Sequence, residues 1–318
     1  MFDTSKTLFM FPGQGSQYVG MAQEFMNMPE TKHFFEEADD ALSQHLTKLM
    51  LDGDEKELGL TENTQPALLL SSYVAYKYLE KQTGEKLENL CKYVAGHSLG
   101  EYSALCVADV FSLSDGLRLV KKRGQAMQQA VPVGVGGMAA IISSFTTEEL
   151  QQNLVGKCWI ANDNANGQVV ISGKMEDVDA SCEKLTNAGA KRVIKLPVSA
   201  PFHSELMQPA ADVMAEELEK VSFNKPAVGL IQNVTAEVIN DTDIIKSGLV
   251  QQMCGQVKWR ESMQLAAQND VTQLYELGSG KVLTGLAKRC DKTLKAMQLN
   301  TPQQIDTLLE ELHKERVA

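Results

Sequence analysis

Long apolar runs are missing from this sequence. It contains no stretch of eighteen consecutive apolar residues, and its first ten residues, which include Asp3 and Lys6, lack both the basic start and the long apolar core of a signal peptide. We therefore expect a cytoplasmic protein that does not bind membranes. Cysteine is sparse as well. The six cysteines are widely spaced and form no Cys-x-x-Cys pair. This pattern argues against a zinc site and a disulfide framework, and it favours buried, reduced thiols.

Positive charge is also in short supply. The chain has 30 Lys and Arg residues against 41 Asp and Glu residues, and its formal net charge of −11 argues against general nucleic-acid binding. Internal repeats and low-complexity tracts are absent from the sequence. The 318 residues are 43% hydrophobic and 22% charged, which is enough apolar material for one large globular domain or for one domain with an insert.

The most informative segment present is Gly96-His97-Ser98-Leu99-Gly100, between a short strand predicted over 93–95 and a helix predicted over 99–107. A serine flanked by glycines at such a turn is typical of a nucleophile elbow, where the backbones approach too closely for side chains and the hydroxyl is exposed. The helix start adds N–H donors and the positive end of a dipole. The bare pattern also arises by chance, so Ser98 is a candidate nucleophile that other motifs must support.

A serine nucleophile needs a base, and His203 is the best candidate. It follows Pro201 and Phe202, where the chain returns from a predicted insert. His97 is adjacent to Ser98 in the sequence, so its side chain is expected to point the wrong way. The other histidines lie on predicted surface helices: His33, His45 and His313. From the residues alone, a structural role for His203 stays open.

Arg123 is the second strong signal. In a helix predicted over 114–130 it falls on the same arc as Leu117, Val120 and Met127, whereas the two preceding lysines fall outside that arc. A guanidinium on the core side of a helix needs an anion. A structural ion pair with a buried carboxylate and a snorkelling side chain are the alternatives to a ligand-binding role.

Residues 131–198 have a pattern of their own. Strands predicted over 138–142, 158–161, 168–172 and 191–198 alternate with helices over 147–154 and 175–188 in the order of the ferredoxin-like split unit. We expect residues 131–198 to be an inserted ferredoxin-like α+β subdomain. Asn162 and Asn164, in a predicted loop, could face the cleft beside it. The elbow and the alternating elements of the last third predict an α/β fold, with a large α/β-hydrolase-like catalytic domain of residues 1–130 and 199–318 around a parallel sheet.

Six motifs occur along the chain in a familiar order: FPGQGSQ at 11–17, NTQPA at 63–67, GHSLGEYSAL at 96–105, KRG at 122–124, PFHS at 201–204 and GSGKVLTGL at 278–286. Together they resemble the malonyl-CoA:acyl carrier protein transacylase family, the acyltransferases of fatty-acid and polyketide synthesis, over nearly the whole length. One departure is Ser279, where the family has proline. This change affects the stiffness of the loop and no reacting group.

The resemblance implies roles for ten residues. Ser98 would be the nucleophile and His203 its base, while the backbone N–H groups of Gln14 and Leu99 would form the oxyanion hole. Arg123 would bind the malonyl carboxylate through its planar fork. The remaining substrate-binding positions would be Met127, Gln65, His97, Asn162 and Phe202. Because no acidic residue is marked as a third member of the triad, a backbone carbonyl from residues 273–280 would orient His203.

The implied reaction is ping-pong transfer of a malonyl group from malonyl-CoA, through a malonyl-serine, to the phosphopantetheine thiol of acyl carrier protein, supplying fatty-acid elongation. No metal or redox cofactor is required, and we expect a monomer with malonyl-CoA and the carrier as its partners. The alternatives are a serine thioesterase or esterase, an acyltransferase of a polyketide pathway, and a non-catalytic carrier-docking module. A hydrolase with the usual order of triad residues would need His313 as its base, and it offers no reason for Arg123.

An acidic carrier must find a local basic patch on a protein of net charge −11. Two segments are candidates. One follows the GSGK turn and the other lies on the last predicted strand of the insert: Lys281, Lys288, Arg289, Lys292 and Lys295, and Lys191, Arg192 and Lys195. Ordinary solvated lysines are the alternative interpretation.

Overall fold

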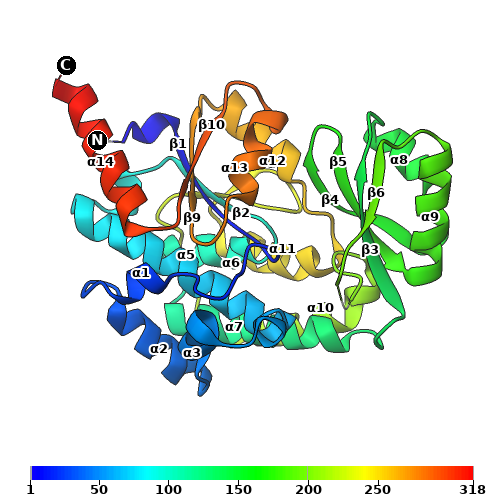
Figure 1. Cartoon of the computed structure of the whole chain (residues 1–318), viewed down its shortest axis with the longest axis horizontal. Coiled ribbons are helices and arrows are strands. Elements are labelled where there is room, and N and C mark those ends of the chain that lie inside the picture. Colours follow the sequence, from blue (N-terminus) through cyan, green and yellow to red (C-terminus); the bar gives the residue numbers. More distant parts are fainter. Residues whose placement is uncertain (1, 199, 318) are drawn as a thin grey trace.

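The structure, a computed structural model, describes residues 2–198 and 200–317 and contains two separate sheets (Figure 1). Ser199, the first residue of the second predicted catalytic segment, lies outside the described residues. In the figure the larger sheet lies among most of the helices, and the smaller sheet, with α8 and α9, stands beside it. No helix in the described ranges is long and apolar enough to cross a membrane.

The larger sheet has six strands in the order β10-β9-β1-β2-β7-β8. All neighbouring strands are parallel except the pair β7 and β8, which is antiparallel. The strand bounds, in that spatial order, are Lys295–Leu299, Gln273–Leu277, Thr7–Phe11, Tyr93–Gly96, Gly229–Ile231 and Val238–Ile239. Strand β1 is buried along its whole length, as a strand in the middle of a parallel sheet covered on both faces must be.

Alternate residues of β1 enter two different cores, because successive side chains of a strand point to opposite faces. Leu8 and Met10 pack with helices α12 and α13, while Phe9 and Phe11 pack with α5, α6 and α7. The helices of this unit are α1 Gln23–Met26, α2 Lys32–Leu42, α3 Leu46–Asp52, α4 Glu55–Leu58, α5 Thr61–Thr83, α6 Gly100–Val107, α7 Leu113–Gln129, α10 Gln208–Glu219, α11 Thr242–Cys254, α12 Trp259–Gln268, α13 Val282–Cys290 and α14 Pro302–Val317. Short 3₁₀ helices cover Thr4–Lys6, Leu87–Asn89 and Glu205–Met207.

The smaller sheet is antiparallel, with the order β4-β5-β3-β6. Its strands are β4 Cys158–Ala165, β5 Gln168–Lys174, β3 Gly136–Ile142 and β6 Arg192–Lys195, and its helices are α8 Thr147–Asn153 and α9 Met175–Asn187. Both helices pack on one face around Ile141, Ile171 and Leu185, whereas Met138 and Val170 join the core cluster of the larger unit. This strand order is that of the ferredoxin-like unit. The predicted fold class, a hydrolase-like α/β core with a small α+β unit, is confirmed.

Several element bounds differ from the sequence-based expectation. The charged, amphipathic pattern of residues 29–52 predicts one surface helix, but the structure has two, because Ser43 adopts a left-handed φ of 49° after α2. Helix α5 begins at Thr61 because the Leu60 carbonyl already accepts two backbone N–H groups. The sequence predicts a helix over 67–79 with Thr64 as its cap. In the structure Thr64 instead lies inside α5, and its hydroxyl donates to the Leu58 carbonyl at 2.6 Å. The six cysteines are free, and all except Cys254 are buried, as expected.

Candidate active site

The serine elbow sits where β2 ends and α6 begins. Ser98 has a φ of 52°, a left-handed conformation that points its hydroxyl away from the sheet. A Cβ on Gly96 would lie 1.9 Å from the Gly100 carbonyl, and one on Gly100 would lie 2.1 Å from the Phe11 carbonyl oxygen. Both positions therefore accept only glycine, and their close packing maintains the strained turn that presents Ser98.

His203 faces this serine. The Ser98 Oγ lies 2.8 Å from His203 Nε2, and His203 Nδ1 lies 2.8 Å from the backbone oxygen of Gln252. A carbonyl can only accept, so Nδ1 carries the proton and Nε2 is the acceptor for the serine hydroxyl. Burial, helped by the positive charge of Arg123, lowers the pKa of His203 to about 3. The imidazole is therefore neutral at physiological pH, as a general base must be.

The orienting carbonyl differs from our expectation. It belongs to Gln252 in the last turn of α11, whereas the sequence had suggested a residue between Gln273 and Gly280. No motif marks this residue, because a backbone carbonyl carries no sequence signature. Its selection depends on where α11 packs against the residues that follow the small unit, which only the tertiary structure specifies.

Two side chains that the sequence analysis missed hold the elbow. Asn233 accepts the Ser98 N–H at 2.7 Å and donates to the Gly96 carbonyl at 2.7 Å. The Gln252 side-chain amide donates to the Ser98 carbonyl at 3.1 Å. Asn233 closely follows β7, at the carboxyl edge of the parallel sheet, where α/β folds place functional groups. That position is the signal that could have identified it.

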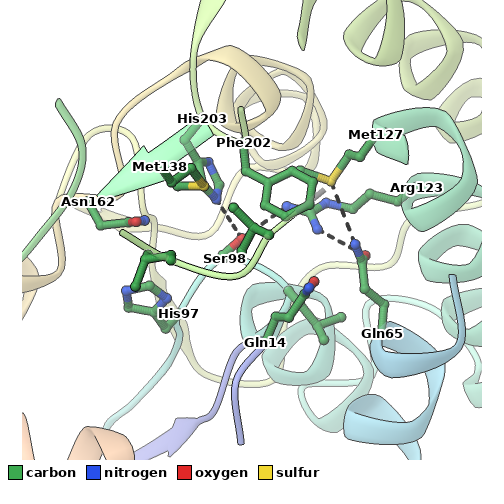
Figure 2. Close-up of a pocket in the computed structure, with 13 residues that line it drawn as sticks. Gln14, Gln65, His97, Ser98, Arg123, Met127, Met138, Asn162, Phe202 and His203 are labelled. Carbon is green, nitrogen blue, oxygen red and sulfur yellow. Dashed lines mark hydrogen bonds between the residues drawn. The ribbon is translucent and has the colours of Figure 1, made fainter. Parts of the chain in front are cut away.

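Arg123, on α7, is 1% exposed and reaches the same serine (Figure 2). Its Nη1 donates to Gln65 Oε1 at 2.9 Å, and its Nη2 donates to Gln252 Oε1 at 2.8 Å and to Ser98 Oγ at 3.1 Å. The face of the Tyr102 ring lies 5.5 Å from the guanidinium carbon. Burial lowers the pKa of Arg123, yet the described part of the chain gives it no ion pair and leaves its Nε without an acceptor.

A buried cation without an anionic partner is costly unless a ligand completes the site. The structural ion pair considered from the sequence is not found within residues 2–198 and 200–317. Arg123 has only neutral acceptors in these ranges, and one of them is the candidate nucleophile. The arrangement suits an acyl group that carries its own carboxylate.

The cavity in front of Ser98 has a volume of about 130 Å³ and collects all ten residues proposed from the sequence. Three further apolar residues, contributed by or close to the smaller sheet, complete the wall: Met138, Leu196 and Val198. Figure 2 shows Met127 and Gln65 beside Arg123, and His97 and Asn162 on the opposite side of Ser98. The Gln65 amide lies 3.6 Å from the Met127 sulfur.

Gln14 and Leu99 line this cavity next to the serine. Within the described residues their backbone N–H groups make no hydrogen bond, so both donors are available to a ligand. The preceding Gly13 packs tightly on the elbow, since a Cβ there would lie 2.5 Å from the His97 carbonyl oxygen. The glycines on both sides of Gln14 predict a side chain that is free to approach a ligand, but in the structure it donates weakly to the Thr61 hydroxyl at 3.4 Å.

The two asparagines of the small unit lie on a strand and not in a loop, because β4 extends to Ala165. Asn162 lines the cavity, where the strand bulges and bridges to Val257. Asn164 does not line it. Its Oδ1 lies 2.7 Å from His97 Nε2, which fixes the orientation of that half-buried ring. His97 therefore contributes to the wall of the cavity and makes its hydrogen bond away from Ser98.

Comparisons with known proteins agree on one family. The acyl transferase domain family matches residues 8–282. The chain is similar to the malonyl CoA-acyl carrier protein transacylase of Bacillus subtilis, with 41% identity over 98% of this chain and 98% of the relative. It is also similar to the crystal structure of the acyl-carrier-protein S-malonyltransferase of Bartonella henselae, with a TM-score of 0.93, 46% identity, and coverage of 96% of this chain and 99% of that one. A structure of a type II PKS acyl carrier protein in complex with its malonyl-transacylase matches with a TM-score of 0.91 and 38% identity, over 96% of this chain and 99% of that one.

Proposed function

This chain belongs to the acyl transferase family of malonyl-CoA:acyl carrier protein transacylases, and on that premise we propose how its own residues perform the transfer. It is an enzyme that moves a malonyl group from malonyl-CoA to the phosphopantetheine thiol of acyl carrier protein. We propose fatty-acid elongation as the process that it supplies.

In the first half-reaction, the Ser98 oxygen attacks the thioester carbonyl while its proton passes to His203 Nε2, 2.8 Å away. The carbonyl oxygen becomes an oxyanion, and the backbone N–H groups of Gln14 and Leu99 donate to it. Collapse of this intermediate breaks the carbon–sulfur bond, and the proton on His203 passes to the sulfur of CoA. The product is a malonyl ester of Ser98.

The second half-reaction runs in the opposite direction. The carrier thiol gives its proton to His203 and attacks the malonyl ester, and the same two N–H groups hold the oxyanion. The bond to Ser98 then breaks, and its oxygen recovers the proton from His203. In both half-reactions the Gln252 carbonyl, 2.8 Å from His203 Nδ1, stabilises the imidazolium that forms when the ring carries two protons.

The observation that carries this proposal is the buried guanidinium beside the nucleophile. Arg123 Nη2 lies 3.1 Å from Ser98 Oγ, so a three-carbon diacid can be esterified at one end and held at the other. A planar guanidinium can bind a carboxylate through two parallel hydrogen bonds. Met127, Phe202 and Met138 supply apolar walls around the intervening methylene.

A serine hydrolase is the second candidate, but the structure offers it little. His313, the base that its usual triad order would require, lies on α14 and lines a different surface pocket with Phe2, Thr83 and Leu312. The base that contacts Ser98 is His203. A hydrolase function also does not explain why a guanidinium without an ion pair is buried next to Ser98.

The test is intact-mass measurement of the enzyme after mixing with malonyl-CoA, with and without holo carrier protein. We expect a malonyl adduct on the wild type, no adduct on Ser98→Ala, and malonyl-carrier when the carrier is present. The His313→Ala variant is the matched control and should behave as wild type. Release of free malonate without transfer to the carrier would support hydrolysis, and an adduct on Ser98→Ala would place the nucleophile elsewhere.

The rest of the proposal concerns organisation. Residues 131–198, which contain the smaller sheet, act as an inserted subdomain, and residues 1–130 and 199–318 form the catalytic domain. This division is supported by the separation of the two sheets. The proposal includes a cytoplasmic, monomeric enzyme. It needs no metal or redox cofactor, because the steps above require only proton transfer and hydrogen-bond donors.

A further inference from the structure

One buried carboxyl group in the catalytic region has no part in the steps above. Glu101 lies in the first turn of α6, three residues after the nucleophile, and is 0% exposed. Its Oε2 accepts from Gln252 Nε2 at 2.6 Å and from the Asn233 N–H at 3.4 Å, whereas its Oε1 has no partner within the described residues. Glu101 does not line the cavity. Any influence on the substrate must therefore pass through a neighbour.

The neighbour is the side-chain amide of Gln252, which connects Glu101 to Arg123. Its Nε2 donates to Glu101 at 2.6 Å and to the Ser98 carbonyl at 3.1 Å, and its Oε1 accepts from Arg123 Nη2 at 2.8 Å. Only one orientation of the amide directs its NH₂ group to these acceptors and its oxygen to the Arg123 donor. Rotated by half a turn, it would present its NH₂ group to the guanidinium, donor against donor. Its oxygen would then face the acceptors Glu101 and the Ser98 carbonyl, and also Asn233 Oδ1, which lies 3.4 Å from Nε2.

Arg123 depends on this amide for its direction. It has two amide acceptors, Gln65 Oε1 and Gln252 Oε1, and the hydroxyl of Ser98. Among the described residues, the only partner of the Gln65 NH₂ group is the thioether of Met127, at 3.6 Å, which is a weak acceptor. The orientation of Gln252 is enforced by the Glu101 carboxyl group, whose Oε2 accepts at 2.6 Å with or without a proton on Oε1.

We propose that Glu101 is a positioning residue for acyl-group selection: through the Gln252 amide it holds the Arg123 guanidinium next to Ser98, where a substrate carboxylate would bind. The inference rests on the proposed malonyl transfer and names a determinant of its specificity. Removal of the carboxyl group takes away the nearest acceptor of the amide, so the amide is held less firmly and the guanidinium can tilt. The rate constant for acylation by an acyl-CoA that carries a carboxylate then falls more than that for an acyl-CoA without one.

The experiment measures the rate constant kcat/KM for acylation of Ser98 by malonyl-CoA and by acetyl-CoA, using rapid quench and intact mass. The readout is the malonyl-to-acetyl ratio, because general damage to the site cancels in it. Glu101→Ala should lower the ratio about 10- to 100-fold, because the contact that it weakens, between the guanidinium and the substrate carboxylate, is a hydrogen bond between charged groups. Glu101→Gln should keep the ratio within about threefold of wild type, because its amide oxygen still accepts from Gln252.

Two further variants separate positioning from stability. Glu276, on β9, is also 0% exposed, and its carboxyl accepts from Leu283 and Thr284. Glu276→Ala is the matched control and should lower the thermal midpoint without changing the ratio. In an Arg123→Ala background, Glu101→Ala should leave the ratio unchanged, since its effect acts through the missing guanidinium.

An unchanged ratio in Glu101→Ala, a ratio in Glu101→Gln as low as in Glu101→Ala, or a full effect without Arg123 would each overturn the inference. If Glu101→Ala does not fold, Gln252→Met replaces it. That variant removes the connecting amide but keeps the carbonyl that orients His203, and it should lower the ratio by a similar factor; an unchanged ratio would overturn the inference. A wild type that forms no malonyl adduct would overturn the proposed function itself, which is a different result.

Discussion

Arg123→Ala is the most direct test of why this site contains a buried cation. The substitution removes the guanidinium that lies 3.1 Å from Ser98 Oγ and leaves the amide oxygens of Gln65 and Gln252 without their donor. Those changes are common to every acyl donor, so they do not alter the ratio of the malonyl to the acetyl rate constant. The loss specific to malonyl-CoA is the charge-assisted contact with the substrate carboxylate, which has no substitute among the described residues of the cavity.

The expected magnitude follows from this geometry. A buried, hydrogen-bonded charge pair loses about 2–5 kcal/mol when one partner is removed. At about 1.4 kcal/mol per factor of ten, this corresponds to a fall of about 30- to 5,000-fold in kcat/KM for malonyl-CoA. Acetyl-CoA carries no carboxylate, so its rate constant should stay comparable or improve, because the variant no longer buries an unpaired charge in the acetylated site.

The assay is single-turnover acylation of Ser98 with each donor, followed by intact mass. Arg118→Ala is the matched control, because Arg118 lies on the same helix with 59% of its side chain exposed and should leave both rate constants unchanged. Equal losses for malonyl-CoA and acetyl-CoA in Arg123→Ala would refute the reasoning and assign Arg123 a structural role.

Three other predictions concern the base and the carrier. Because burial lowers the pKa of His203 to about 3, its basic form persists in acid, and kcat/KM for acylation should stay flat from pH 8 to about pH 5; a midpoint near 6.5 would contradict the structure. Below about pH 6.5 the unfolded chain binds a proton at His203 that the folded chain does not bind, so the free energy of unfolding should decrease as the pH falls. The decrease should be less steep in His203→Gln. Urea titration at each pH measures both. The exposed pairs Lys191 and Arg192, and Lys288 and Arg289, are candidates for carrier docking. Replacing both residues of either pair by Glu should raise the KM for the carrier and flatten the salt dependence of that KM, while acylation of Ser98 persists. If both variants transfer to the carrier as well as wild type at low salt, the carrier docks on another surface.

Features that depend on local sterics could be predicted from the sequence. The elbow is one, because the approach of Gly96 to Gly100 and of Gly100 to Phe11 involves neighbouring turns and a strand pairing that glycine alone permits. The inward direction of Arg123 is another, since a helix of 3.6 residues per turn assigns each side chain to a face. The order of elements in residues 131–198 likewise predicted a ferredoxin-like sheet.

Features that depend on distant segments needed the tertiary structure. The carbonyl that orients His203 comes from Gln252, 49 residues further on, and was expected from another segment. Glu101 meets the same residue across 151 positions. Backbone carbonyls and buried amides carry no periodic or motif signal, and which of them meet is decided by the packing of α11 against α6 and the elbow. The sequence by itself determined the turn that presents the serine and predicted the proposed reacting groups, because these follow from short-range sterics and residue chemistry. Only the folded chain decided which neutral and acidic side chains hold those groups in place, because that choice belongs to contacts between helices far apart in the chain.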